Sequence, residues 1–574
     1  MDRDVPQELP ARRGFTISYR GKTLLSKIDP VSQGERLAAG IPVKERTLYL
    51  CPSPLYGYGL PVLLEKLRSD PNSKNSAILC VEADERLFGI SQKAFAEYEA
   101  PHENFPSPAL IKASSPEQVC AFARKTWGER IFRRLEIFRP NGGWQLFPKL
   151  YDDIEAALRR EIALEWGNAM TLIRLGRLYS RNLIRNLALL PSGENIGNLT
   201  FGAAPVLVLG AGPSLDSALD ELGACPASIR GESGRAGRRF KIICVDTCLP
   251  ALHERGILPD LVVILESQHW NLKDFSGAAG RKIDAAIDMS ALPASARVLG
   301  GRRFYFATPW THLALFTRLG KAGLLPETFA PLGSVGPSAV ALALSISSGP
   351  VLTSGIDFSY TVDAYHARST PGHTERLIKQ NRFNSIINAA PVFRAGTFSA
   401  VSKNGKPVRS DPAMRKYRDL FEQEFGGKSR LLDIAAPASF AASGLPLGIK
   451  NIPAAEACAI LNSAELPKPE ASSHQADSLM EKNSSMFLRK ETMSAFIAKE
   501  TEILKQLKDM LTGEALPEPA RLEELLDSAD YLWAHFPDCA GAGGRRPPGT
   551  DIGFLKRVRA EIDPFLKLWE ALLK

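Results

Sequence analysis

Short apolar runs, separated by stretches with helical spacing, dominate the middle of the chain between about residues 200 and 400. The runs are nearly continuous rather than alternating, which is typical of strands buried on both faces of a parallel sheet. Because helical patterns lie between them, the sequence predicts an α/β domain with a Rossmann-like parallel sheet covered by helices on both faces. The predicted strands are residues 206–209, 241–245, 261–265, 304–307 and 350–354.

The pattern of residues 1–195 predicts a smaller α/β domain with a bridging helix. Two apolar strands, 46–51 and 77–81, flank an amphipathic helix that ends near Leu67, and a helical pattern over 151–190 leads to the central domain, 200–400. Glycines follow the first strand and Glu82 follows the second, and in nucleotide-binding units an acid at this place can hold a ribose. The glycine pattern is incomplete, so a tight turn that binds nothing is the alternative.

Residues 410–574 predict a C-terminal helical domain. Amphipathic patterns cover 486–511, 522–536 and 552–573, and no candidate chemistry accompanies them. Packing is the default role of such a bundle, and recognition of a protein partner is the alternative.

Composition narrows the class of protein. A net charge of +8 spread over 574 residues, without a dense Lys/Arg run, suits an anionic small-molecule substrate and argues against a nucleic-acid groove. No stretch reaches about 18 uninterrupted apolar residues, so no membrane span is expected. The N-terminus shows no apolar signal segment, and the 8 cysteines form no CxxC pair. These features predict a cytoplasmic protein with reduced, buried thiols. They do not determine the oligomeric state, and a homo-oligomer is one possible state.

Glycine and polar residues gather where the predicted strands end. Ligands of parallel sheets bind outside these carboxyl ends, so we expect one shared cleft. The first turn has the strand, glycine turn and helix layout in which backbone N–H groups meet a phosphate, although alone it is equally compatible with a tight turn. The expected cleft residues are Gly210, Gly212, Ser214, Asp246, Thr247, Glu266, Ser267, Gly333, Ser334 and Asp357.

The ordered motifs GAGPSLD, VDT, GILPD with LVVILES, GSVGPSAVALAL, SGIDFSY and YHA resemble the motility-associated factor (Maf) family of flagellin glycosyltransferases. Relatives of that family contain the 6-hydroxymethylpterin pyrophosphokinase (MptE-like) domain. The resemblance is strongest over about 200–370 and weaker in both flanking domains. One departure is Glu266, where relatives carry Asp, and the extra methylene bears on fine specificity.

The resemblance implies a central domain similar to sialyltransferases. The implied activity is transfer of a nonulosonic acid, of the pseudaminic or legionaminic type, from a CMP-activated donor to Ser or Thr of flagellin. By the same likeness the transfer occurs in the cytoplasm before export, serves flagellum assembly and motility, and requires neither a cofactor nor a metal ion.

That chemistry assigns roles to the cleft residues. The glycine turn with Ser214 fits a phosphate cradle or nucleotide contacts, and the turn at Gly333 and Ser334 fits the CMP phosphate or ribose. Asp246 and Thr247 fit ribose or cytosine edges, and Glu266 and Ser267 face the same cleft.

His366 is the expected catalytic base, because an imidazole titrates near working pH and can take the acceptor proton. Asp357 is the alternative base or the partner that orients His366, and His373 is the less favoured histidine. Arg368 is expected to neutralise the carboxylate of the donor, with a plain surface role as the alternative.

Two other functions compete. A pterin pyrophosphokinase would need ATP and Mg²⁺, and a non-catalytic flagellin-binding chaperone would bind flagellin without consuming a CMP-sugar.

Overall fold

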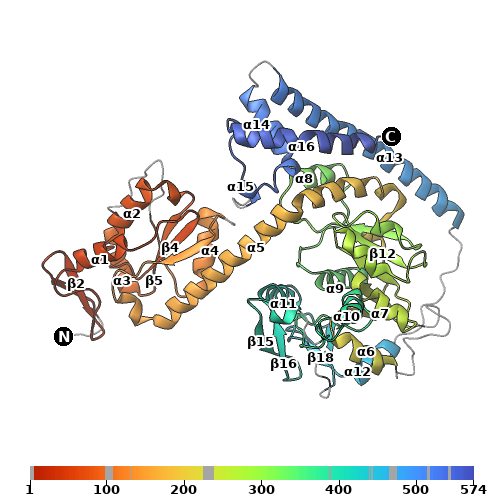
Figure 1. Cartoon of the computed structure of the whole chain (residues 1–574), viewed down its shortest axis with the longest axis horizontal. Helices are drawn as coiled ribbons and strands as arrows, with labels where there is room; N and C mark the ends of the chain where they lie inside the picture. Colours follow the sequence, from red (N-terminus) through yellow and green to blue (C-terminus); the bar gives the residue numbers. More distant parts are fainter. Residues whose placement is uncertain are drawn as a thin grey trace. The chain divides into compact units, whose positions relative to one another are not determined.

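The computed structural model describes residues 5–96, 108–128, 131–223, 238–386, 390–437, 440, 444–463, 475–513, 518–540 and 545–573 (Figure 1). The chain forms two compact units. Unit 1 comprises Met1–Gly176 and Trp533–Pro548, and unit 2 comprises Arg177–Leu532 and Gly549–Lys574. The division falls within the long helix α5 (Pro148–Leu187), which covers most of the predicted bridging helix.

Unit 1 is built on a four-stranded parallel sheet in the order β6-β5-β4-β7. The predicted strands are β4 (Thr47–Pro52) and β5 (Ala77–Glu82); both are buried along their whole length, and α2 (Leu60–Ser69) joins them. Its other elements are the antiparallel β1 (Gln7–Pro10), β2 (Phe15–Tyr19) and β3 (Lys22–Thr23), the strands β6 (Ala109–Lys112) and β7 (Arg134–Ile137), and the helices α1 (Pro30–Ala39), α3 (Glu85–Phe95), α4 (Pro116–Trp127) and α15 (Pro537–Ala540).

Glu82, the acid after the second strand, points into unit 1. Its carboxylate accepts hydrogen bonds from Ser53 Oγ at 2.8 Å and from the N–H groups of Ala83 and Asp84 at 3.0 and 3.1 Å. The side chain is 1% exposed, and burial raises its pKa to about 7. Glu82 therefore stabilises the turn after β4 from inside the unit. Its carboxylate is not exposed, so it is not available to bind a ribose as the sequence suggested.

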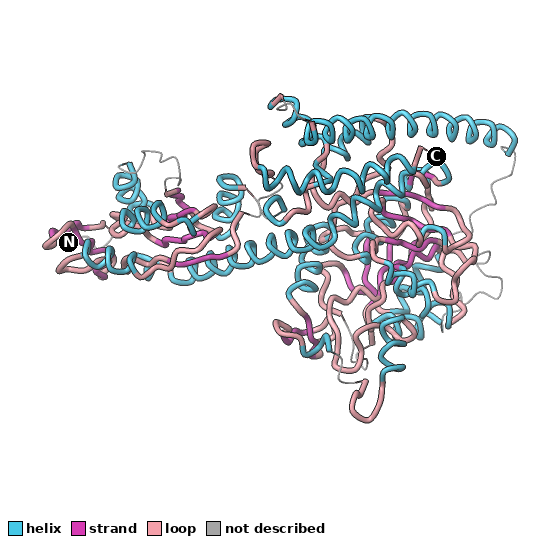
Figure 2. The backbone as a smooth tube through the Cα atoms, turned by 45° about the horizontal axis from the view of Figure 1, so that its top comes forward, coloured by secondary structure: helices cyan, strands magenta, loops and turns pink. Residues whose placement is uncertain are grey.

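Unit 2 contains, among the described residues, a nine-stranded sheet in the order β18-β17-β14-β9-β10-β11-β12-β13-β8. Every neighbouring pair in it is parallel. Figure 2 shows these strands in magenta between cyan helices, so the expected Rossmann-like parallel sheet is confirmed. The strands are β8 (Glu194–Asn195), β9 (Val206–Leu209), β10 (Lys241–Val245), β11 (Leu261–Ile264), β12 (Asp284–Asp288), β13 (Arg303–Phe306), β14 (Val351–Ser354), β17 (Leu431–Ile434) and β18 (Lys450–Ile452).

Helices position the carboxyl ends of these strands. The apolar helix α9 (Val335–Ile346) packs on β9, β10, β11 and β14. The last turns of α5 reach the far strands: the Asn182 amide donates to the Ser267 and Ser290 carbonyls, and the Asn186 amide donates to those of Met289 and Ala291. The other elements here are α6 (Ser214–Gly223), α7 (Leu249–Glu254), α8 (Ala314–Lys321), α10 (Pro371–Lys379), the hairpin β15 (Phe398–Val401) and β16 (Pro407–Ser410), α11 (Pro412–Phe425) and α12 (Ala454–Ser463).

The C-terminal helices α13 (Gln475–Thr512), α14 (Pro519–Ser528) and α16 (Ile552–Ala571) pack against one another in unit 2 (Figure 1). A buried ion pair fixes this bundle to α8, since Arg318 Nε lies 2.6 Å from Glu500 Oε1 and Glu500 is fully buried. Trp569 of α16 donates its indole N–H to Tyr531 at 3.2 Å.

The cysteines depart from expectation at one position. Six described cysteines are free and buried, as predicted, but Cys458 is disulfide-bonded, so the prediction that all the thiols are reduced is wrong there. None of the described helices combines the length and the apolar character that crossing a membrane requires.

Candidate functional site

The strand order places a topological switch point between β9 and β14. From β9 the chain adds β10, β11, β12 and β13 on one side, whereas β14, β17 and β18 lie on the other. Connections leave a switch point in opposite directions, which opens a crevice at the carboxyl ends of the two strands. The turns after β9 and β14 carry Gly210–Ser214 and Asp357, so the structure brings these predicted residues together.

The two glycines of the first turn allow close contact with the turn after β14. Gly210 N–H donates to Ser354 O at 2.8 Å, and Gly212 N–H donates to Gly355 O at 2.7 Å. A Cβ at Gly212 would lie 2.5 Å from Asp357 Oδ2. Both N–H groups are therefore used inside the protein rather than presented to an anion.

Asp357 occupies the beginning of α6. Its carboxylate accepts from Ser214 N–H at 2.7 Å and from Ser214 Oγ at 2.5 Å, and both side chains are buried. A carboxylate at a helix N-terminus makes the same interactions that a bound phosphate would make. The expected phosphate cradle at Ser214 is thus filled by a side chain of the protein itself.

Replacing Gly212 with alanine is expected to lower the free energy of unfolding by about 1–3 kcal/mol, because the new methyl group would overlap the Asp357 carboxylate. Gly320→Ala is the matched control in the same unit: Gly320 lies within α8, and an added Cβ there meets only the side chain of Leu325, at 3.9 Å. That change should be neutral or stabilising by up to about 1 kcal/mol. Urea unfolding of both variants measures the difference, and equal midpoints would contradict the close packing.

A buried lysine stands beside Asp357. Lys403 Nζ lies 2.5 Å from Asp433 Oδ2 of β17, and both side chains are almost wholly buried. Burial raises the pKa of Asp357, and the positive charge of Lys403 opposes that shift; the pKa of Asp433 responds in the same way. Lys403 and Asp433 could not be predicted from the sequence, because Lys403 lies in the loop of the short hairpin β15–β16 and β17 carries no clear strand pattern.

His366 lies directly on the glycine turn. Its Nδ1 is 3.2 Å from Ala211 O, and the N–H of Ala367 donates to the same oxygen at 3.0 Å. A carbonyl oxygen only accepts, so this contact places the proton on Nδ1 and leaves Nε2 as an acceptor. Burial lowers the pKa of His366, which favours the neutral imidazole that a base requires.

The structure corrects the expected link between His366 and Asp357. Both carboxylate oxygens of Asp357 accept from Ser214, whereas the imidazole is oriented by Ala211 O and by the ring of Tyr365, 4.6 Å away. Asp357 contacts Ser214 at the start of α6, whereas His366 contacts the carbonyl oxygen of Ala211 within the glycine turn. The orienting group is therefore a backbone carbonyl.

Arg368 fixes the same loop through its backbone. Its N–H donates to Asp216 Oδ2 at 2.9 Å, and Asp216 Oδ1 also accepts from Arg255 at 2.6 Å. The guanidinium of Arg368 is exposed.

Two buried acids form a second side of the cleft: Asp246 follows β10, and Asp274 lies in the 3₁₀ segment His269–Phe275 that comes after β11. Asn271 Nδ2 donates to Asp246 Oδ2 at 2.7 Å and to Asp274 Oδ2 at 3.1 Å, while Thr247 N–H donates to Asp246 Oδ1. Burial, and then the nearby Asp274 carboxylate, raise the pKa of Asp246 to about 7; burial raises that of Asp274 to about 6. The sequence predicted Asp246 and Thr247 but missed Asn271 and Asp274, whose 3₁₀ segment carries no periodic signal.

The stability of unit 2 is expected to fall as pH rises from 5 to 7, because the folded-state pKa of Asp246, about 7, exceeds its ordinary value of 3.8. Between these two pKa values the unfolded chain has already lost the proton that the folded protein still holds. Each rise in pH therefore lowers the free energy of unfolding, until Asp246 also ionises in the folded protein near pH 7. In Asp246→Asn the slope should be smaller by about 1 kcal/mol per pH unit. Urea midpoints at pH 5, 6 and 7 test this, with the exposed Asp220→Asn as control; an unchanged slope in Asp246→Asn would overturn it.

The remaining predicted residues differ in accessibility. Glu266 is exposed, and its Oε1 accepts from the N–H of Gln268 at 3.0 Å, while Ser267 is buried. Gly333 has φ 76°, and Ser334 precedes α9 without capping it. The first turn of α9 therefore keeps N–H groups without a side-chain cap, so it suits an anion better than the turn after β9 does.

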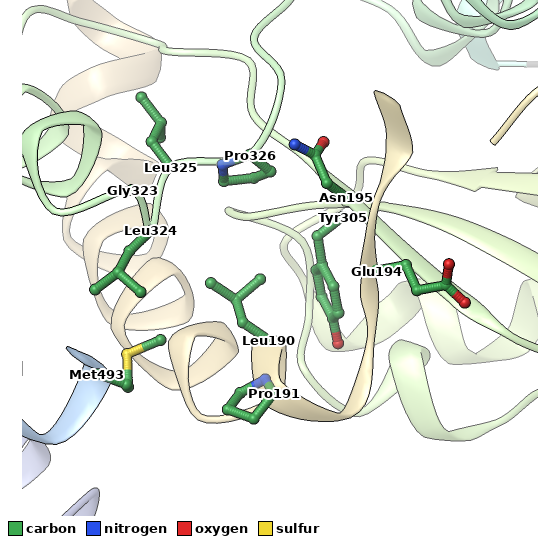
Figure 3. A pocket seen from close by; sticks show the side chains of 10 residues that line it. All are labelled: Leu190, Pro191, Glu194, Asn195, Tyr305, Gly323, Leu324, Leu325, Pro326 and Met493. Carbon is green, nitrogen blue, oxygen red and sulfur yellow. The ribbon is translucent and has the colours of Figure 1, made fainter. Parts of the chain in front are cut away.

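Within the described ranges, no group of three or more His, Cys, Asp or Glu side chains is arranged to hold a metal ion. A separate cavity of about 70 Å³ lies beside β8 and β13 (Figure 3). Leu190, Leu324 and Met493 line it, and no predicted site residue does.

Comparisons with known proteins agree with this architecture. Residues 181–363 match the family described as "6-hydroxymethylpterin diphosphokinase MptE-like". An uncharacterised protein of Treponema pallidum (strain Nichols) is 29% identical over 580 residues, which cover 98% of this chain and 95% of that protein. The solved structure of the Maf glycosyltransferase from Magnetospirillum magneticum AMB-1 superposes with a TM-score of 0.50 at 15% identity, covering 100% of this chain and 92% of that one.

The chain thus has the α/β fold of a Maf glycosyltransferase, and its central domain is MptE-like. The resemblance expected from the motifs is thus borne out in the fold of the chain and in the family that residues 181–363 match.

Proposed function

We propose that the chain is a cytoplasmic glycosyltransferase that moves a nonulosonic acid, of the pseudaminic or legionaminic type, from a CMP-activated donor to serine or threonine of flagellin. The observation that carries the proposal is the contact between Nδ1 of His366 and the carbonyl oxygen of Ala211, in the glycine turn at the switch point. A neutral imidazole with a free acceptor nitrogen, at the edge where parallel sheets bind ligands, is what deprotonation of a hydroxyl requires. The fold of a known glycosyltransferase supports it further.

The transfer exchanges one bond for another at the anomeric carbon of the sugar. The acceptor hydroxyl gives its proton to Nε2 of His366 while its oxygen bonds to that carbon. The bond from the carbon to the phosphate oxygen breaks, and CMP leaves with the electron pair. The uncapped turn at Gly333 and Ser334 receives the phosphate, and the exposed Arg368 meets the carboxylate of the sugar.

Asp357, Asp246 and Asp274 have different roles in this proposal. Asp357 holds the two turns together and acts as a positioning residue. Thr247, which is partly exposed, faces the nucleoside, and the buried pair Asp246 and Asp274 positions it: the N–H of Thr247 donates to Asp246 Oδ1, and its Oγ1 lies 3.4 Å from Asp274 Oδ2. In keeping with the family resemblance, the reaction requires no metal ion.

The second candidate is a pterin diphosphokinase, which the match of residues 181–363 favours. The experiment incubates the purified chain with flagellin and a CMP-nonulosonic acid, with or without EDTA, and measures the flagellin mass. In a parallel incubation, ATP, Mg²⁺ and hydroxymethyl-dihydropterin are assayed for a diphosphorylated pterin. A mass increase by one sugar that survives EDTA supports the proposal. A pterin product without glycosylated flagellin would support the diphosphokinase instead. Binding of flagellin without either reaction would support the non-catalytic chaperone.

A further inference from the structure

An arginine-lined cavity of about 310 Å³ lies in unit 1. It is formed by the residue before β4, the turn before β5 and part of segment 533–548, which belongs to unit 1 although its neighbours in sequence belong to unit 2. Three guanidinium groups face one carboxylate, which leaves an excess of positive charge. The lining residues are Arg46, Asn75, Ile131, Asp538, Arg545, Arg546 and Pro547.

Arg46 is the informative side chain. It is only 9% exposed, and its Nη1 is buried without a hydrogen-bond partner among the described residues. Leaving such a donor unsatisfied is costly, and an arginine nitrogen cannot neutralise itself by losing a proton. Among the described residues, the guanidinium of Arg46 therefore has fewer acceptors than donors, and an anion in the cavity that it lines would add acceptors.

Among the described residues, no printed ion pair or hydrogen bond joins a carboxylate to the guanidinium of Arg46. Glu45, the adjacent carboxylate, lies 3.5 Å from Arg133, whose guanidinium covers the Trp166 ring at 4.0 Å. The positive charge of Arg46 acts with burial to lower the pKa of Arg133, so the two arginines repel each other across this wall. A bound anion would offset that repulsion.

Arg545 approaches from the other side of the cavity. One of its nitrogens donates to Trp127 O at 2.8 Å, which anchors the side chain. A guanidinium carries five N–H donors in a planar fork, so donors remain for a ligand.

We propose that this cavity binds the phosphoryl group of a small phosphorylated molecule, held between Arg46 and Arg545. Arginine forks match phosphate oxygens in a bidentate manner, and the volume exceeds that of a single phosphate group. Bound ligand would hold Arg545 close to Arg46, the residue before β4. This phosphate site shares no residue with the transferase site proposed in unit 2. The experiments on the two sites therefore test two independent proposals.

The test uses the full chain and inorganic pyrophosphate as the probe. Trypsin cleaves after Arg545, while the bond from Arg546 to Pro547 resists it, so cleavage in this segment reports on the cavity. Pyrophosphate is expected to slow cleavage after Arg545 at least threefold compared with sodium chloride of equal ionic strength. Cleavage after the exposed Lys27, outside the cavity, is the internal control for trypsin itself.

Arg46→Gln is expected to abolish this protection and to weaken pyrophosphate binding in calorimetry about tenfold or more. Arg174→Gln removes an exposed arginine of the same unit outside the cavity and should leave the protection intact. Arg46→Lys keeps the positive charge but loses the planar fork of donors, so it should give partial protection from trypsin. Partial protection in Arg46→Lys would show that the cavity tolerates a substitution at this position, and that the loss in Arg46→Gln is not due to misfolding. No protection in the wild-type chain, or full protection in Arg46→Gln, would overturn the proposal.

Discussion

Replacing Lys403 with methionine is expected to lower the free energy of unfolding of unit 2 by roughly 3–5 kcal/mol, because removing one partner of a buried ion pair leaves the other charge uncompensated. The loss is large here since Lys403 faces two buried carboxylates: Asp433 at 2.5 Å, and Asp357, whose pKa it lowers against the effect of burial. Hydrogen exchange of peptides from β14 and β17 measures this loss locally, next to the substituted residue.

The direction of the pH dependence follows from the same charges. Burial already raises the pKa of Asp357 and Asp433 above the ordinary value, and removing Lys403 raises both further. An acid with a raised folded-state pKa favours the folded protein while it stays protonated, and that contribution disappears as pH rises. The Lys403→Met variant should therefore be most destabilised at pH 8 and partly recover at pH 5.

Lys450→Met is the matched control, because Lys450 pairs with Glu456 at the surface, at 3.1 Å with both side chains exposed. Such pairs contribute about 0–1 kcal/mol. The double variant Lys403→Met with Asp433→Asn removes one uncompensated charge and should recover part of the loss. If Lys403→Met behaves like Lys450→Met, the buried network does not stabilise the switch point.

The central sheet was predictable because its strands are apolar on both faces. The runs that became β9, β10, β11 and β13 contain almost no polar residue, and a parallel sheet is the arrangement that buries them. In β12 two alanines and one isoleucine lie between two aspartates, and β17 and β18 lie in an Ala/Pro/Ser-rich stretch. These strands are defined by pairing with neighbouring strands, which local periodicity does not record.

The site was predictable only in outline. Parallel strands place all their carboxyl ends at one edge, so the polar residue after each strand marks the cleft from sequence alone. Which groups meet within it depends on the crossing of two turns 140 residues apart or more. Asp357 reaches Ser214 rather than His366, and Gly212 serves close backbone contact, because β14 lies beside β9 in space.

In the proposed transfer, His366→Asn is expected to lower kcat by about 10²–10⁴-fold, the usual contribution of a positioned base. Asparagine can still donate an amide N–H to Ala211 O, as Nδ1 of His366 does, but it lacks the acceptor at Nε2. The loop should keep its seat on the glycine turn, so KM for the donor should change little. Burial lowers the pKa of His366 below its ordinary value of 6.5, so the wild-type rate should fall only below about pH 6.5 and be level above it.

His373→Asn provides the control for His366→Asn. His373 lies in α10, where its Nδ1 accepts from Ser369 N–H at 3.3 Å, and it makes no described contact with the glycine turn. Its substitution should leave kcat within about twofold, as expected for a residue that only supports a loop. Flagellin glycosylation rates from pH 5 to 9 for the wild-type chain and both variants decide the assignment. A His366→Asn variant that is folded and retains the wild-type rate, or a His373→Asn variant that loses it, would move the base away from His366.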